Sequence, residues 1–148
     1  MAGGDISHTV LVVDDEEEIL ELLGEYLRAR GFELRTAYDG EAALEIVRGG
    51  NVDIVLTDMK MPHMGGVELL EHIRNLHRPV ATILMTGYGT VETAIAAMKA
   101  GAYDYLLKPF RLREVHAALV RAAERLDQER ENARMRDLLA FYEQACKM

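Results

Sequence analysis

With 148 residues, of which 49% are hydrophobic and 28% charged, the chain has the size and composition of one globular domain, which excludes a wholly disordered or collagen-like protein. No apolar run approaches the roughly 20 residues of a membrane-spanning helix, the N-terminus is not a secretory signal, and one cysteine excludes a disulfide framework, so we expect a cytoplasmic protein without membrane contact. Residues 1–110 carry 9 Lys and Arg against 18 Asp and Glu, and because phosphate backbones repel such a surface we expect no direct contact with nucleic acid.

The first part of the chain has the pattern strand, helix, strand, helix. A nearly continuous apolar run at 9–13 is typical of a strand buried on both faces, and the helical spacing after it stops before Gly31. The run at 32–37 alternates between polar and apolar residues, as an edge strand does. Asp39 is the expected N-cap of the next helix, which ends at a pair of glycines.

The second part continues the alternation. Apolar runs at 52–57, 80–86 and 103–107 are each followed by a helical pattern, and Thr90 is the expected cap of the fourth helix. The fifth helix begins near Leu112. Because strands that alternate with helices form parallel sheets covered on both faces, the sequence predicts an α/β fold of this kind.

The last helical pattern is longer than one domain needs. Its first apolar stripe is interrupted by polar residues, and a second apolar set continues out of phase, at Met135, Leu138, Leu139 and Tyr142. About three turns suffice to cover the sheet, so the remainder must bury its stripe elsewhere. Two interpretations stay open: a coiled coil with a second copy of the chain, and a frayed end left by truncation of a longer protein.

Polar side chains follow four of the predicted strands. Asp14 and Asp15 follow the first run, Asp58 the third and Lys108 the fifth, while Thr86 ends the fourth. Ligands bind beyond the carboxyl ends of the strands in an open parallel sheet, so these groups are expected at one edge. Three neighbouring carboxylates repel one another unless a hard cation lies between them, and Mg²⁺ takes such oxygen ligands.

A carboxylate beside a metal ion and a lysine can attack a phosphoryl group and become an aspartyl phosphate. Asp58 is the expected nucleophile because it ends a central strand, whereas Asp14 and Asp15 open a helix and are better placed as metal ligands. Thr86 could donate to a phosphoryl oxygen, although a β-branched strand residue needs no such role. Helix capping alone would explain one strand-end aspartate but explains three of them and a lysine poorly.

Three segments resemble, in this order, the receiver domain of bacterial two-component response regulators: LVVDDEEE, VLTDMKMPHMGGVELL and ILMTGYGTVETAIAAMKAGAYDYLLKPF. The similarity spans about residues 8–125 and is nearest in type to receivers of σ54-activator-type regulators. It implies a flavodoxin-like (βα)5 fold with strand order 2-1-3-4-5. Before this domain we expect a disordered N-terminus at 1–7. Residues 126–148 would form an extended signalling or coiled-coil helix that leads to an output domain absent from, or unseen in, this chain.

The resemblance also implies how the phosphoryl group is received. Asp58 would accept it from a sensor histidine kinase or a histidine phosphotransfer protein. Mg²⁺, or Mn²⁺ in its place, would be held by Asp14, Asp15, Asp58 and the backbone carbonyl of Lys60.

The remaining residues of the motif would bind the phosphoryl group and pass the signal on. Lys108 would bind the phosphoryl group, and its bond to Pro109 would be cis. Thr86 and Tyr105 would form a switch pair, with Tyr105 on the last strand facing the fourth helix. The signal would leave through the face of the fourth helix and the fifth strand. From the apolar stripe of the last helix, rather than from the resemblance, we expect a homodimer joined through that helix.

Three functions are compared on these residues. In the first, the chain is a phosphorylation-controlled switch that catalyses only its own phosphorylation and dephosphorylation and is not a turnover enzyme. In the second, it is a haloacid-dehalogenase-type phosphatase, a family with a second acid two residues after the nucleophile; Lys60 stands at that position and argues against it. In the third, it is a coiled-coil adaptor with a degenerate receiver fold, which the complete set of acids, threonine and lysine disfavours.

Overall fold

The computed structural model describes residues 8–87 and 89–147; the predicted disordered segment 1–7 lies outside these ranges. Within them, strands and helices alternate strictly along the chain. The strands are β1 (Thr9–Val13), β2 (Glu33–Ala37), β3 (Ile54–Asp58), β4 (Ala81–Thr86) and β5 (Asp104–Leu107). The helices are α1 (Glu17–Arg28), α2 (Gly40–Arg48), α3 (Gly66–Arg74), α4 (Val91–Lys99) and α5 (Leu112–Cys146). Each described strand begins within two residues of the apolar run that predicted it.

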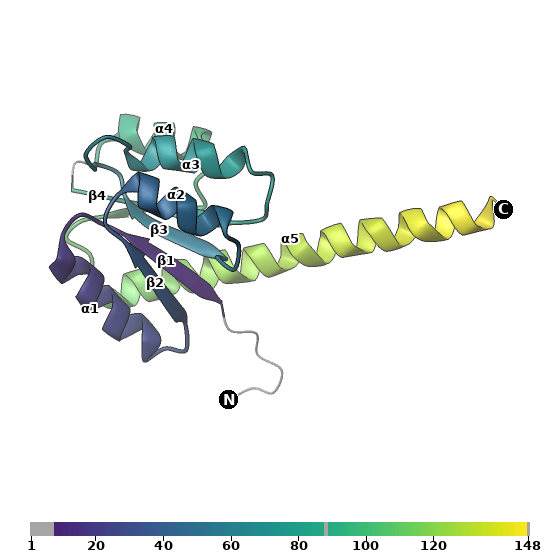
Figure 1. Cartoon of the computed structure of the whole chain (residues 1–148), viewed down its shortest axis with the longest axis horizontal. Coiled ribbons are helices and arrows are strands. Elements are labelled where there is room, and N and C mark those ends of the chain that lie inside the picture. The colour runs from purple at the N-terminus through teal and green to yellow at the C-terminus, as the bar shows by residue number, and fades with distance from the viewer. Residues whose placement is uncertain (1–7, 88, 148) are drawn as a thin grey trace.

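The strands form one parallel sheet in the order β2-β1-β3-β4-β5. Helices α1 and α5 cover one face, and α2, α3 and α4 cover the other (Figure 1). The predicted flavodoxin-like fold and its strand order are therefore confirmed. The strand order reverses beside β1, which places a ligand site of this fold class at the carboxyl ends of β1 and β3.

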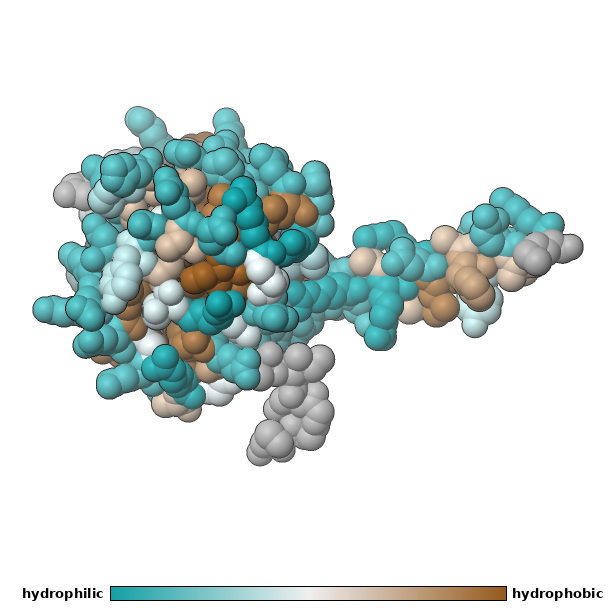
Figure 2. Space-filling view, in the orientation of Figure 1, coloured by the Kyte–Doolittle hydropathy of each residue, from teal (hydrophilic) through white to brown (hydrophobic). Residues whose placement is uncertain are grey.

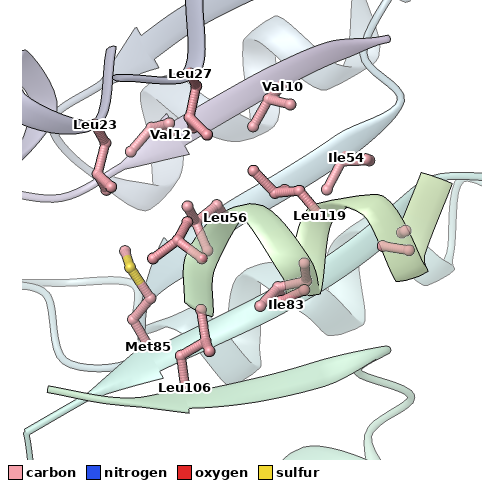
Figure 3. Close-up of a cluster of buried hydrophobic side chains, with 14 of the residues drawn as sticks. Val10, Val12, Leu23, Leu27, Ile54, Leu56, Ile83, Met85, Leu106 and Leu119 are labelled. Atoms are coloured by element: carbon pink, nitrogen blue, oxygen red, sulfur yellow. The ribbon is translucent and has the colours of Figure 1, made fainter. Parts of the chain in front are cut away.

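The hydrophobic core explains which strands the sequence revealed most clearly. β3 and β4 are buried along their whole length, as their continuous apolar runs predicted, whereas β2 is mostly exposed at the edge of the sheet. Between the sheet and α5, Leu119 packs with Leu56 and Ile83 in a cluster without access to water (Figure 3). Burial of each such side chain contributes about 1.5–3 kcal/mol, so this layer fixes α5 against the sheet.

The expected helix caps are present. The carboxylate of Asp39 accepts a hydrogen bond from the Ala42 N–H at the start of α2, at 2.8 Å. Thr90 and Thr93 form a reciprocal capping box at the start of α4. Each cap satisfies backbone donors that a helix start otherwise leaves unpaired, and so fixes where the helix begins.

The fifth helix is far longer than its buried part. Its buried residues are Val115, Ala118, Leu119, Ala122, Ala123 and Leu126, and beyond them the helix projects from the domain (Figure 1). The projecting part exposes the predicted second apolar set and Phe141 (Figure 2). None of the described helices combines the length and the apolarity that a membrane crossing requires.

Polar contacts continue the attachment of α5 past Leu126. They pair Asp127 with His8, Glu129 with the Tyr103 hydroxyl, and Arg130 with Asp53 and the Pro79 carbonyl. These partners lie at or just before the first residues of β1, β5, β3 and β4, so the contacts gather at the amino edge of the sheet. The amino edge therefore holds the helix at the point where it leaves the domain.

Candidate functional site

Acidic side chains gather at the carboxyl edge of the sheet, where β1 and β3 end. Carboxylate oxygens of Asp14, Asp15 and Asp58 all lie within 4.8 Å of one another. Asp14 has no exposed surface and Asp58 is 9% exposed, whereas Asp15 is open to solvent. The structure thus brings together the three acids that the predicted strand ends had placed at this edge.

Asp14 and Asp15 lie in the loop before α1. The sequence analysis expected the two acids to open this helix. That expectation is wrong, because the helix begins at Glu17 and both acids precede it. One oxygen of Asp14, Oδ1, accepts a hydrogen bond from the Glu16 N–H at 2.9 Å. That bond fixes the carboxylate so that its other oxygen, Oδ2, points to Lys108.

Lys108 brings positive charge to the same place from the end of β5. Its Nζ atom lies 3.1 Å from Asp14 Oδ2 and 3.4 Å from Asp58 Oδ2. Burial alone would lower the pKa of Lys108, but the hydrogen bond and charge of Asp14, with the charge of Asp58, raise it above its ordinary value. Lys108 is therefore held as an ammonium group between two carboxylates. The peptide bond from Lys108 to Pro109 is cis.

The environment of Asp58 disfavours its negative charge. Burial is the largest cause of the raised pKa of Asp58, and the nearby carboxylate of Asp14 adds to it. The charge of Lys108 and a hydrogen bond from the Lys60 backbone N–H act in the opposite direction. Further positive charge at this edge would therefore favour the ionised, nucleophilic form of Asp58.

The oxygen donors fit a hard divalent cation. Three carboxylates within reach of one ion carry more negative charge than the single ammonium of Lys108 offsets. Mg²⁺ is held by carboxylate and carbonyl oxygens, and the described group contains no histidine or thiolate that would favour a softer metal.

The loop after β3 is held close to Asp58 by a glycine that the sequence analysis missed. A Cβ atom at Gly66 would lie 2.6 Å from the Asp58 carbonyl oxygen, closer than packing permits. The backbone N–H of Gly66 also donates to the carbonyl of Met59 at 2.9 Å. The adjacent pair Gly65 and Gly66 was the available signal, because glycines after a strand mark a close backbone approach.

The two expected switch residues lie on neighbouring strands. Thr86 is 2% exposed at the end of β4, and Tyr105 pairs with Leu84, two residues earlier on that strand. Side chains two residues apart on a strand share one face, so Thr86 and Tyr105 lie on the same side of the sheet. The Tyr105 hydroxyl lies 2.7 Å from Thr93 Oγ1 on α4, a partner that the sequence did not reveal.

Comparison with known proteins agrees with this geometry. A family model described as the response regulator receiver domain matches residues 10–120. Regulatory protein AtoC of Escherichia coli (strain K12) is 39% identical over 113 residues, which are 76% of this chain and 24% of AtoC. Nitrogen assimilation regulatory protein NtrX of Azorhizobium caulinodans is 34% identical over 135 residues, 90% of this chain and 30% of NtrX. The chain thus spans less than a third of either relative.

A solved structure shows the same fold. The response regulator receiver domain protein of Clostridium thermocellum superimposes with a TM-score of 0.77 at 36% identity, over 82% of this chain and 98% of that protein. AtoC and NtrX are σ54-activator-type regulators, so the expected similarity to receivers of that type is confirmed.

Proposed function

The chain belongs to the response regulator receiver family, and we propose that it is a phosphorylation-controlled signalling switch whose phosphoryl acceptor is Asp58. The observation that carries this proposal is the group of three carboxylates and one lysine at the carboxyl edge of the sheet. The phosphodonor is the phosphohistidine of a sensor histidine kinase or of a histidine phosphotransfer protein. A cytoplasmic location is part of the proposal and is supported by family membership.

The transfer needs one nucleophile and groups that hold negative charge. A carboxylate oxygen of Asp58 attacks phosphorus; the new P–O bond forms as the P–N bond to histidine breaks, and its electron pair stays on the imidazole. Lys108, 3.4 Å from Asp58 Oδ2, holds the charge of the phosphoryl oxygens. Thr86 donates its hydroxyl to one of these oxygens.

A divalent cation is the cofactor of this proposal. Mg²⁺ or Mn²⁺ would be held by Asp14, Asp15, Asp58 and the backbone carbonyl of Lys60. When bound, it neutralises charge on the oxygens of the transferred group. The clustered oxygens of the three aspartates support this assignment.

Return to the starting state is hydrolysis. Water attacks phosphorus, the P–O bond to Asp58 breaks, and inorganic phosphate leaves while the carboxylate is restored. The chain thereby catalyses its own phosphorylation and dephosphorylation and turns over no separate substrate. Its family membership disfavours the phosphatase interpretation, as does Lys60 at the position of that family's second acid.

The signal leaves through the side of the domain formed by α4 and β5. Thr86 and Tyr105 connect the phosphoryl site to this face, which exposes apolar side chains at Val91, Ile95 and Leu107. We place the receiver domain at residues 8–125. The helix at 126–148 would lead to an output domain, or the signal would pass to a separate partner protein. The small share of each relative that the chain covers supports a following domain.

A homodimer through the projecting end of α5 completes the proposal. Met135, Leu138 and Tyr142 are about half exposed on this helix and follow the spacing of a coiled-coil seam. Removal of residues 127–148 is then expected to weaken the dimer in light scattering. A monomeric intact chain at high micromolar concentration would contradict the dimer without affecting the phosphoryl site.

The acceptor is tested by substitution. Asp58→Asn is expected to abolish the Mg²⁺-dependent uptake of a phosphoryl group from acetyl phosphate, as measured by mass spectrometry of the intact protein. Asp39→Asn is the matched control, because asparagine caps a helix as well as aspartate does and uptake should be retained. Full labelling of Asp58→Asn would overturn the assignment.

A further inference from the structure

We propose that Thr93 is a positioning residue of the switch, which holds the Tyr105 hydroxyl and ties the position of that ring to the first turn of α4. The inference rests on the proposed function, in which Thr86 and Tyr105 connect the phosphoryl site to the side of the domain formed by α4 and β5. It adds Thr93 as the group from which Tyr105 must separate, and α4 as the element that this separation loosens.

The contact between the two side chains is short and sheltered. Thr93 Oγ1 and the Tyr105 hydroxyl oxygen are 2.7 Å apart, the usual length of a hydrogen bond between hydroxyl groups. Both residues are partly buried, so water competes less well for either hydroxyl than it would on an open surface. The bond joins α4 directly to β5, although the residues are 12 positions apart in sequence.

The same threonine is part of the cap of α4. Thr93 Oγ1 accepts the Thr90 backbone N–H at 2.9 Å, and the Thr93 N–H donates to Thr90 Oγ1 at 3.1 Å. A capping box usually has Glu or Gln at this position, whose longer side chain reaches back to the cap. Here one short hydroxyl contacts both the cap and Tyr105. Displacement of the Tyr105 ring therefore changes the hydrogen bonding of the first turn of α4.

α4 has little apolar burial to oppose such a change. Among its described residues only Ala97 is buried, whereas α1 buries three leucines. Burial of an alanine methyl group contributes far less than burial of a leucine side chain. The Tyr105 ring itself packs in the small cluster that contains Ala97 and Leu84. A single hydrogen bond is consequently a large share of what holds α4, and elements with little burial are those that shift most easily.

These observations give the switch a defined sequence of contacts. When Thr86 moves toward the phosphoryl group, space opens beside Tyr105, and the ring enters it only if its bond to Thr93 breaks. The bond therefore stabilises the ring position seen in the structure, and its loss loosens the first turn of α4. One hydrogen bond typically changes the ratio of two such populations about fivefold.

The bond is tested by fluorine NMR on the full chain labelled with 3-fluorotyrosine, with the signal of residue 105 assigned by its loss in Tyr105→Phe. Thr93→Val removes the hydroxyl at nearly constant shape, and Thr93→Ser keeps it. Beryllofluoride defines the signal of the second ring position in the parent. In the unmodified chain, Thr93→Val is expected to raise about fivefold the population ratio of this second ring position to the position seen in the structure, as read from the Tyr105 signal. Thr93→Ser should restore the parent signal. An unchanged Tyr105 signal in Thr93→Val would overturn the proposal.

A double-mutant cycle separates positioning from simple capping. Tyr105→Phe removes the hydroxyl of the ring and leaves the capping box intact. Amide exchange in the first turn of α4 is measured in both single variants and in the double variant. If Thr93→Val accelerates exchange equally with and without the Tyr105 hydroxyl, Thr93 is only a cap and the proposal fails. Failure of the proposed function would instead appear as no phosphoryl uptake on Asp58, and the comparison of unmodified chains would still report on Thr93.

Discussion

Arg130 joins α5 to the amino ends of two strands. Its Nη2 atom donates to Asp53 Oδ1 at 2.8 Å and to the Pro79 carbonyl oxygen at 3.1 Å. The other oxygen of Asp53 accepts the Thr9 N–H at 2.8 Å, which ties the same carboxylate to the start of β1. Arg130→Ala removes both bonds to the helix, and we expect α5 beyond Leu126 to separate more easily from the domain.

The size of the effect follows from the exposure of the pair. The Arg130 and Asp53 side chains are 37% and 21% exposed, so the pair is neither fully solvated nor buried. Exposed ion pairs contribute about 0–1 kcal/mol, and hydrogen bonds to charged groups about 1.5–3 kcal/mol. We therefore expect Arg130→Ala to lower the free energy of unfolding by about 1–2 kcal/mol.

Arg134→Ala provides the matched control. Arg134 is 79% exposed and pairs with Glu131 of the same helix, so its loss should cost less than about 0.5 kcal/mol. Urea unfolding measures the stabilities, and hydrogen exchange of residues 127–133 measures the local opening of α5. Exchange there should accelerate about tenfold in Arg130→Ala for each 1.4 kcal/mol lost. Equal stability and equal exchange in the two variants would refute the attachment of α5 through Arg130.

Two further predictions concern single side chains. The hydroxyl of Thr82 is buried and has no hydrogen-bond partner among the described residues, so Thr82→Val should raise the free energy of urea unfolding by about 1 kcal/mol; a loss of stability would contradict this reasoning. Burial and the hydrogen bond to Glu129 raise the pKa of Tyr103 to about 12, so the folded state binds this proton more tightly than the unfolded state. The stability advantage of the parent over Tyr103→Phe should therefore be constant at pH 8–9 and decline between pH 10 and about 12, and an advantage that grows above pH 10 would be the contrary result.

The parts of the fold that the sequence predicted well are those with local signals. β3 and β4 are central and buried on both faces, so their residues form continuous apolar runs that are hard to mistake. Asp58 and Lys108 could be placed at one edge because each directly follows a predicted strand and the carboxyl ends of parallel strands meet there. The cap at Asp39 was predictable because capping depends on neighbouring backbone groups.

Other features depend on packing between distant elements. The bond from Thr93 to Tyr105 exists because α4 packs against β5 with one particular offset along the strand, and no local sequence pattern encodes that offset. Asp53 and Arg130 are 77 positions apart, and each looks like an ordinary surface charge until the fold brings them together. The start of α1 was placed too early because the carboxylate of Asp14 contacts the backbone of the loop and Lys108.

Formation of an aspartyl phosphate can be observed directly on the intact chain. After incubation with acetyl phosphate and Mg²⁺, borohydride reduces the acyl phosphate to an alcohol and converts the modified aspartate to homoserine, which peptide mass spectrometry locates in the sequence. We predict homoserine in place of Asp58 and unmodified Asp14 and Asp15. Homoserine in place of Asp14 or Asp15, or a labelled chain with no homoserine, would contradict the assignment of Asp58 as the phosphoryl acceptor.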